Sequence, residues 1–120
     1  MPVPSLHSSV LKWPDLEQVR AAVTEWARAL VSTDERVSSI GYAGSYARGD
    51  WGVGSDVDLI ILVRETEAPF TERARSFDAT RLPVPADVLV YTESEWGRMD
   101  GENRLGPLVW VATRGAAASP

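Results

Sequence analysis

The sequence predicts an α/β fold in which a small mixed β-sheet is flanked by helices. Residues 14–32 carry apolar side chains at steps of three and four, which is typical of a helix with one face on a core. Residues 59–63 are apolar without interruption, as in a strand covered on both faces. With 120 residues and 44% hydrophobic composition the chain can bury one core, so we expect a single domain over residues 1–120.

Composition narrows the classes of function. The chain has no cysteine, which excludes disulfides and thiol catalysis. Its formal net charge of −5 argues against a broad nucleic-acid-binding face. We find no signal-like start and no apolar run of membrane-spanning length, so we expect a cytoplasmic protein without membrane contact. Residues 1–12 and 115–120 show no sustained period and are expected to be loosely ordered.

The first predicted helix covers about residues 14–32. Pro14 suits a first helical turn, and Asp15 and Glu17 lie near the positive end of the helix dipole. We interpret the apolar stripe as core-facing, although the same stripe could bind a partner. Its members are Leu16, Val19, Val23, Trp26 and Leu30.

Three segments have the composition of strands. Residues 37–42 are partly β-branched, residues 59–63 should form the middle of the sheet, and residues 87–91 should form a strand at its edge. Between the last two, residues 71–81 have helix-compatible composition, and two prolines follow them.

The end of the chain is less regular. Thr92-x-x-Glu95 predicts a capping box that opens a short helix, which residues 100–103 should close. The segment 105–113 is ambiguous, because its β-branched centre favours a strand while Pro107 and its apolar spacing favour a helix.

The candidate functional motif begins at Gly44-Ser45. A glycine-serine turn that opens a helix offers unpaired backbone N–H groups and the positive end of a dipole, and both suit a phosphate. Arg48 could contact that phosphate, or it could pair with Asp50 and hold the loop that follows. Trp51 in this loop could stack on a base or pack on the surface.

Asp56 and Asp58 form the second half of the motif. Alternate residues of a strand point to one face about 6.6–6.8 Å apart, so the two carboxylates converge while Val57 and Leu59 face the core. Converging carboxylates attract a cation, and Mg²⁺ is satisfied by one or two of them with water and phosphate oxygens.

Gly44-Ser45, ten intervening residues and Asp56-x-Asp58 together resemble the signature of the DNA polymerase β-like nucleotidyltransferases. Arg48-Gly49 and Ser55 make the chain most similar to minimal, single-domain members, which include the MntA-like antitoxins paired with HEPN-domain toxins. This resemblance favours a helix for residues 105–113.

The resemblance implies a third carboxylate, at Asp87, on a strand beside the motif. Asp87 stands among apolar residues, and a buried lone carboxylate is costly unless it is paired or bound to metal. The implied catalytic metal ligands, for two Mg²⁺ ions, are Asp56, Asp58 and Asp87. The implied nucleotide-binding residues are Gly44, Ser45, Arg48 and Ser55.

The implied activity is transfer of a nucleotide, AMP from ATP, to a hydroxyl acceptor. The minimal relatives point to a tyrosine of a HEPN-type toxin as acceptor, so the protein would act as an antitoxin without contacting nucleic acid directly. Two alternatives stay open: a non-catalytic nucleotide-binding antitoxin module, and a transferase, acting as a homodimer, that modifies a small molecule.

Overall fold

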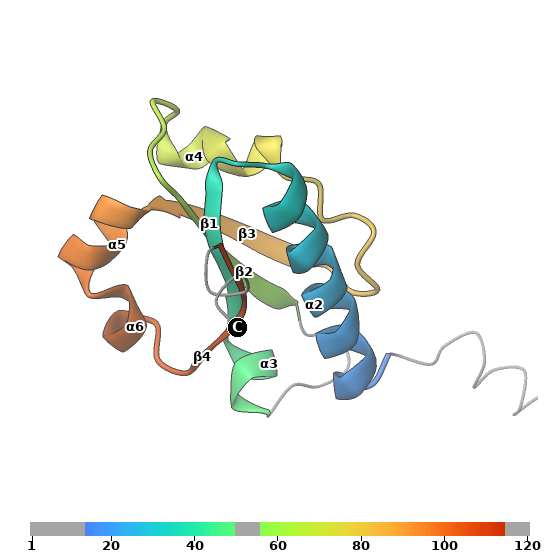
Figure 1. Ribbon diagram of the computed structural model, residues 1–120. Helices are drawn as coiled ribbons and strands as arrows, with labels where there is room; N and C mark the ends of the chain where they lie inside the picture. Colours follow the sequence, from blue (N-terminus) through green and yellow to red (C-terminus); the bar gives the residue numbers. More distant parts are fainter. Residues whose placement is uncertain (1–13, 50–55, 115–120) are drawn as a thin grey trace, which may run out of the picture.

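The computed structural model describes residues 14–49 and 56–114, and they form a four-stranded mixed sheet with helices on both faces (Figure 1). The strand order is β3-β2-β1-β4. The strands are β1 (Val37–Ala43), β2 (Val57–Val63), β3 (Ala86–Thr92) and β4 (Leu108–Thr113). β1 runs antiparallel to β2 and β4, and β2 runs parallel to β3. The predicted fold class is confirmed, with the apolar run of β2 inside the sheet and β3 at one edge.

Helix α2 (Leu16–Thr33) covers one face of the sheet. Asp15 begins it with a capping box, in which the Gln18 N–H donates to the Asp15 carboxylate at 2.8 Å and the Asp15 N–H donates to Gln18 Oε1 at 2.9 Å. The predicted apolar stripe faces the sheet, where Val19 and Val23 are buried. Ala27, which the predicted stripe did not include, is buried with them. Buried strand residues that complete this core include Val37, Ile40, Tyr42, Val57, Leu59, Ile61 and Val63.

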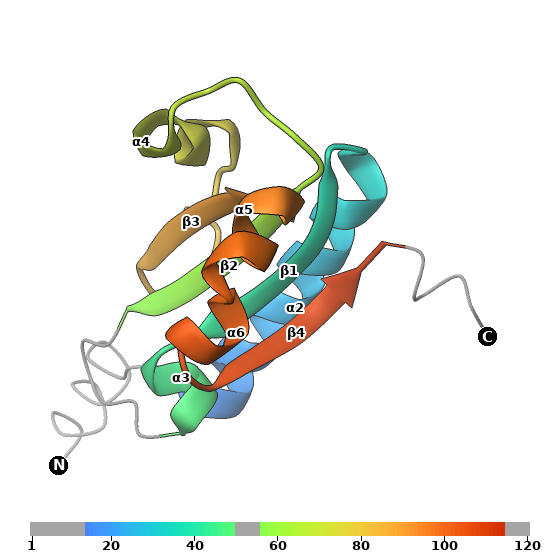
Figure 2. The same cartoon turned by 90° about the vertical axis from the view of Figure 1, so that its left-hand side faces the viewer.

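The other face is covered by two short helices, α5 (Glu93–Met99) and α6 (Gly101–Arg104), which lie in front of the sheet in Figure 2. Beneath them, Ile60 and Leu62 of β2 are buried. The Trp96 ring lies 5.8 Å from the Trp110 ring of β4, edge to face. The smaller core on this side is therefore partly aromatic, and it leaves one end of the sheet uncovered.

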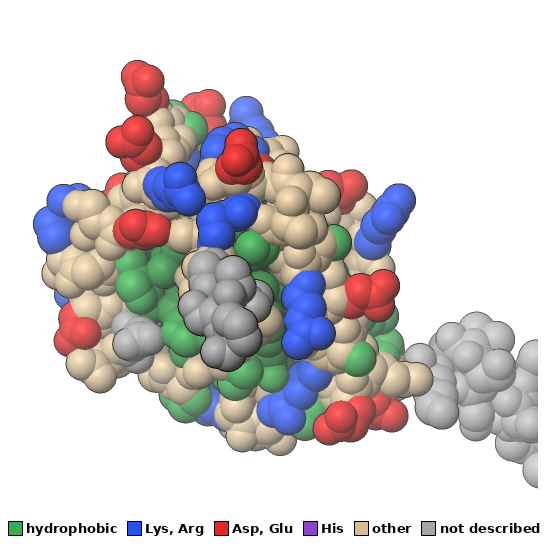
Figure 3. Space-filling view, in the orientation of Figure 1, with side chains coloured by type: hydrophobic (Ala, Val, Ile, Leu, Met, Phe, Trp, Pro, Cys, Tyr) green, Lys and Arg blue, Asp and Glu red, His purple; other side chains and the backbone are tan. Residues whose placement is uncertain are grey.

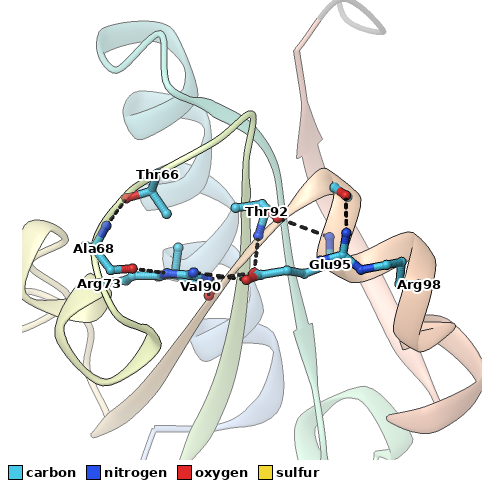
Figure 4. A network of polar contacts seen from close by, with 8 residues as sticks. Thr66, Ala68, Arg73, Val90, Thr92, Glu95 and Arg98 are labelled. Carbon is cyan, nitrogen blue, oxygen red and sulfur yellow. Dashed lines mark hydrogen bonds and ion pairs between the residues drawn. The ribbon is translucent and has the colours of Figure 1, made fainter.

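A buried guanidinium joins three elements at the edge of the sheet (Figure 4). Arg73 ends α4 (Phe70–Arg73), which continues as a 3₁₀ turn (Ala74–Ser76). Its side chain donates to both Glu95 oxygens, at 2.6 and 3.0 Å, and to the Val90 carbonyl at 3.1 Å. Glu95 also completes the predicted capping box with Thr92. The helix expected over residues 71–81 is thus shorter and starts one residue earlier.

One prediction for the end of the chain is wrong and one is confirmed. Residues 108–113 form β4 and not a helix, because β1 offers an unpaired edge that β-branched residues can fill, and this tertiary pairing overrides the local spacing. The predicted end of α5 is confirmed at Asp100, its C-cap, whose N–H donates to the carbonyls of Trp96 and Gly97. Asp100 adopts a left-handed conformation (φ 52°) and α6 begins directly after it. Over the described segments no helix is long and apolar enough to cross a membrane.

Candidate functional site

The predicted phosphate-binding turn forms where β1 ends. Gly44 adopts φ 74° and ψ −150° and leads into α3 (Ser45–Arg48). The N–H groups of Ala47 and Arg48 donate to the Gly44 carbonyl at 3.1 and 3.0 Å, so the turn is closed. The first N–H groups of a helix have no acceptor within it and are open to an anion.

Sheet register brings Asp58 between this turn and Asp87. Asp58 is paired with Ala43 across the antiparallel β1–β2 ladder and with Asp87 across the parallel β2–β3 ladder. Neighbouring strands lie about 4.8 Å apart, so the side chains at paired positions share a face. Residues 44, 58 and 87, which are distant in sequence, therefore meet at one end of the sheet, on the face that α5 and α6 leave uncovered there.

The close approach of Asp58 to the turn depends on Gly44. A Cβ atom on residue 44 would overlap Asp58 Oδ2, and the positive φ of this residue also disfavours side chains. The sequence motif thus combines two needs in one glycine: the turn conformation and room for a carboxylate against the backbone.

The structure corrects the expected environment of Asp87. Its side chain is exposed, as is that of Asp56, whereas Asp58 is half-buried. Asp87 is the second residue of an edge strand, and the covering helices lie against later residues of that strand. The prediction that Asp87 is buried is therefore wrong. Its proposed role as a metal ligand rests on its register with Asp58.

Asp58 is subject both to burial and to the charges of its neighbours. Burial raises the pKa of Asp58, the nearby charges of Asp87 and Asp56 raise it further, and Arg48 lowers it. Desolvation and like charges both disfavour the ionised form, so a cation at this place would relieve the repulsion.

The donor set fits a magnesium ion that a substrate helps to hold. Among residues 14–49 and 56–114, no three acidic or histidine side chains converge closely enough to form a metal cage by themselves. Mg²⁺ commonly takes only one or two carboxylates and completes its shell with water and phosphate oxygens. Two carboxylates in register, those of Asp58 and Asp87, meet this need for one or two carboxylate ligands.

Arg20 contributes to the site although sequence reasoning missed it. From α2 it donates to the Tyr46 carbonyl at 2.9 Å, and its guanidinium carbon lies 6.0 Å from the centre of the Tyr42 ring. Its Nε is buried without a hydrogen-bond partner in the part of the chain that is described. Its position in the sequence could have indicated this. Arg20 is four residues after Leu16 and three before Val23, so it lies on the same side of the helix as the apolar stripe.

Ser55, Asp50 and Trp51 fall outside the described residues, so the two roles considered for Arg48 are not separated. A cavity of about 720 Å³ lies beside the edge strand. Its lining residues fall between Ala74 and Val88, and none of the three carboxylates, Asp87 included, is one of them. Its one acidic group, Asp78, already accepts hydrogen bonds from Thr80. We therefore place the functional site at the turn and not in this cavity.

Comparison with known proteins identifies the family. The model of the nucleotidyltransferase domain matches residues 24–105. The chain belongs to this family. A crystal structure of a Sulfolobus solfataricus protein assigned as a nucleotidyltransferase superposes with a TM-score of 0.64, at 20% sequence identity, over 82% of this chain and 84% of that one. No curated protein matches the sequence.

Membership of the family establishes a transferase fold and a general activity on nucleoside triphosphates, which such domains use together with a divalent metal. The matched span contains the turn at Gly44 and all three carboxylates. At 20% identity the structural likeness shows the fold alone.

Proposed function

We propose that this nucleotidyltransferase moves AMP from ATP to a hydroxyl group in a reaction that requires Mg²⁺. The observation that carries the proposal is the placement of Asp58 between the Gly44 turn and Asp87. Phosphate-binding N–H groups and metal-binding carboxylates are the two parts that phosphoryl chemistry needs side by side.

Each part has a separate role. The N–H groups that open α3 and the Ser45 hydroxyl would hold the terminal phosphates of the nucleotide, with Arg48 as a further contact. Asp56, Asp58 and Asp87 would hold Mg²⁺, one ion or two. When bound, the metal supplies charge stabilisation of the triphosphate and lowers the pKa of the acceptor hydroxyl.

The reaction is a displacement at the α-phosphorus. The acceptor oxygen forms a bond to this phosphorus as the bond to the β-phosphate bridging oxygen breaks, and pyrophosphate leaves with that electron pair. The acceptor proton passes to Asp87, whose side chain is exposed, or to solvent. The described residues offer positioning and electrostatic stabilisation, which suffice without a protein nucleophile.

We propose that another protein brings the acceptor. The described residues form a single sheet with its covering helices, without a second lobe over the carboxylates, and two of the three carboxylates are exposed. The resemblance to MntA-like antitoxins supports a HEPN-type toxin as that protein and one of its tyrosines as the acceptor.

Ligand-dependent thermal unfolding tests the nucleotide site before the acceptor is known. Mg–ATP should raise the melting temperature of the wild-type protein, because a ligand specific to the native state stabilises it by mass action. ATP with EDTA should raise it less, and Asp58→Asn should lose the metal-dependent part. An equal, metal-dependent shift in Asp58→Asn would refute the assignment of the metal site.

A further inference from the structure

The position of Asp87 depends on how its strand enters the sheet. Asp87 is the second residue of β3, an edge strand, and its side chain is exposed. Among residues 14–49 and 56–114, none donates a hydrogen bond to its carboxylate. Described side chains therefore do not hold Asp87 beside Asp58, and its placement follows from the backbone that leads into β3.

The residues directly before β3 combine two prolines with two buried side chains. Leu82 and Val84 are 9% and 4% exposed, whereas Pro83 and Pro85 lie on the surface. Proline fixes its own φ at about −65° and disfavours the helical region for the residue before it, so Leu82 and Val84 are restricted to extended backbone. Residues 82–85, which we call the entry segment, thus have little conformational freedom.

The buried side chains anchor the entry segment in the core on the α2 side of the sheet. Leu82 and Val84 belong to one cluster with Val57 and Leu59, the two neighbours of Asp58 in the chain. In Figure 3 hydrophobic side chains gather near the centre of the view, between the places of α2 and α5 in Figure 1. The entry segment continues the α2 side of this core at the β3 edge.

A backbone hydrogen bond fixes the register where the entry segment meets β2. The Val57 N–H donates to the Pro85 carbonyl at 3.0 Å. The first pair of the parallel ladder, Val57 with Ala86, follows directly, and the next pair is Asp58 with Asp87. A slip of one residue would turn Asp87 to the other face of the sheet, so this bond helps to determine on which face the carboxylate lies.

We propose that Val84 is a positioning residue for the metal site. Its buried side chain, in a restricted backbone, holds Pro85 against Val57 and thereby holds Asp87 opposite Asp58. Val84 packs on the α2 side of the sheet, and the paired carboxylates share the other face, so Val84 acts through the backbone and does not touch the metal. The inference rests on the proposed role of Asp87 as a metal ligand.

Matched valine-to-alanine variants on the two sides of Asp87 test the inference. Val84→Ala and Val90→Ala each remove branched methyl groups from a buried position, 4% and 2% exposed, and both should lower the melting temperature. Titration of Mg²⁺ in saturating ATP, followed by the rise in melting temperature, gives the half-saturating Mg²⁺ concentration of each variant.

Only one of these variants should affect the metal. Val84→Ala should raise the half-saturating Mg²⁺ concentration roughly tenfold, the lower end of the loss expected when a group that orients a metal ligand is removed. Val90→Ala should leave this concentration unchanged, because Val90 lies beyond Asp87, where Arg73 donates to its carbonyl. An equal rise in both variants would overturn the inference, since it would reflect a general loss of stability.

Pro85→Ala keeps the test decisive if Val84→Ala does not fold. It retains the carbonyl at position 85 and the buried side chains and releases only the backbone restriction, so it should raise the half-saturating Mg²⁺ concentration by a smaller factor. Amide hydrogen exchange follows the positioning without any ligand. The Val57 amide should exchange faster in Val84→Ala and Pro85→Ala than in wild type or Val90→Ala. Unchanged exchange and unchanged Mg²⁺ binding in both entry-segment variants would refute the proposal.

Asp87→Asn distinguishes failure of this inference from failure of the proposed function. If Asp87→Asn binds Mg²⁺ and ATP like wild type, the metal role of Asp87 is refuted, and the proposal for Val84 falls with it even if the Val57 amide exchanges faster. If Asp87→Asn loses Mg²⁺ binding while Val84→Ala and Pro85→Ala retain it, the proposed function stands and only the inference about Val84 is overturned.

Discussion

The carboxylate of Asp58 occupies the space that a side chain on Gly44 would need. Gly44→Ala should therefore displace Asp58 and strain the turn, because this residue also has φ 74°. We expect loss of at least about 100-fold in nucleotide transfer, in line with the loss of a charge-stabilising group. Initial rates of pyrophosphate release, with circular dichroism to verify folding, measure the effect.

Gly49 supplies the matched control for this change. It also has a positive φ, 86°, but a Cβ there would meet nothing within 4 Å. Gly49→Ala should cost only about 1 kcal/mol of unfolding free energy from backbone strain and leave turnover largely intact. If both variants lost activity equally, strain in the turn and not the space for Asp58 would explain the loss.

Asp58→Asn should make the metal-free protein more stable. Burial and two neighbouring carboxylates raise the pKa of Asp58, so the stabilising, protonated form prevails at low pH and is lost as pH rises through the raised folded-state value. Above that pH the wild-type protein carries an unfavourable charge that asparagine lacks. Allowing for solvent screening, the gain should be below about 1 kcal/mol, or roughly 5 °C in melting temperature.

The same variant should lose turnover and the stabilisation by Mg–ATP. The comparison is made by thermal unfolding at pH 7 in EDTA and then in excess Mg–ATP. A variant less stable than wild type in EDTA would show that Asp58 has a structural partner and not an uncompensated charge.

Glu95 should make the stability of the protein depend on pH in the direction opposite to that of Asp58. Its bidentate pairing with Arg73 and its hydrogen bond from the Thr92 N–H lower the pKa of Glu95 from its usual 4.5 to about 2. Stability from this group is present above the unfolded value and is lost as pH falls through the folded value. Unfolding free energy measured in urea should decline between about pH 5 and pH 2, and Glu95→Gln should reduce that slope.

Breaking the Arg73–Glu95 ion pair should reduce the unfolding free energy more than breaking an exposed ion pair. Arg73→Gln leaves carbonyls and a partly buried carboxylate without their donor, which we expect to cost about 2–4 kcal/mol. Arg36→Gln removes the exposed pair with Asp34 and should cost less than about 1 kcal/mol. Similar losses in the two variants would mean that the Arg73 network does not join α4 to α5 as the structure indicates.

The sequence predicted the parts of the fold that depend on local pattern. The stripe of α2, the apolar run of β2 and the Thr92–Glu95 capping box all follow from spacing along the chain, and all three are present. β4 was mispredicted because its conformation depends on an edge offered by β1, about 70 residues earlier, which no local window contains.

For the candidate site, the sequence motif predicted the turn at Gly44 and the carboxylate of Asp58. That these two lie beside each other and beside Asp87 follows only from the register of the sheet. The argument for Asp87 relied on burial, which a sequence cannot give for an edge strand. Arg20 was missed for a similar reason: its contact with the Tyr46 carbonyl spans 26 residues and two elements.

Arg20 should position the turn without contacting substrate. Arg20→Gln removes a charged donor to the Tyr46 carbonyl, and we expect a weaker response of melting temperature to Mg–ATP and a raised KM, with a smaller change in kcat. Arg20→Lys, which retains the charge and one donor, should recover part of the KM effect. Equal damage in both variants, or a loss confined to unfolding temperature without nucleotide, would indicate a purely structural residue.

The last prediction concerns the acceptor. If a HEPN-type toxin encoded beside this protein is the acceptor, incubation of the pair with ATP and Mg²⁺ should add one or more AMP groups to a toxin tyrosine, each of roughly 329 Da, which intact-mass spectrometry resolves. The Asp56→Asn/Asp58→Asn double variant should still bind the toxin, since these carboxylates are proposed to hold metal and not the partner, but it should add no mass. A double variant that silenced the toxin as fully as wild type would instead favour a binding antitoxin without turnover. Mass gain and silencing with wild type alone would tie the antitoxin effect to the carboxylates at positions 56 and 58, of which Asp56 is exposed and Asp58 half-buried.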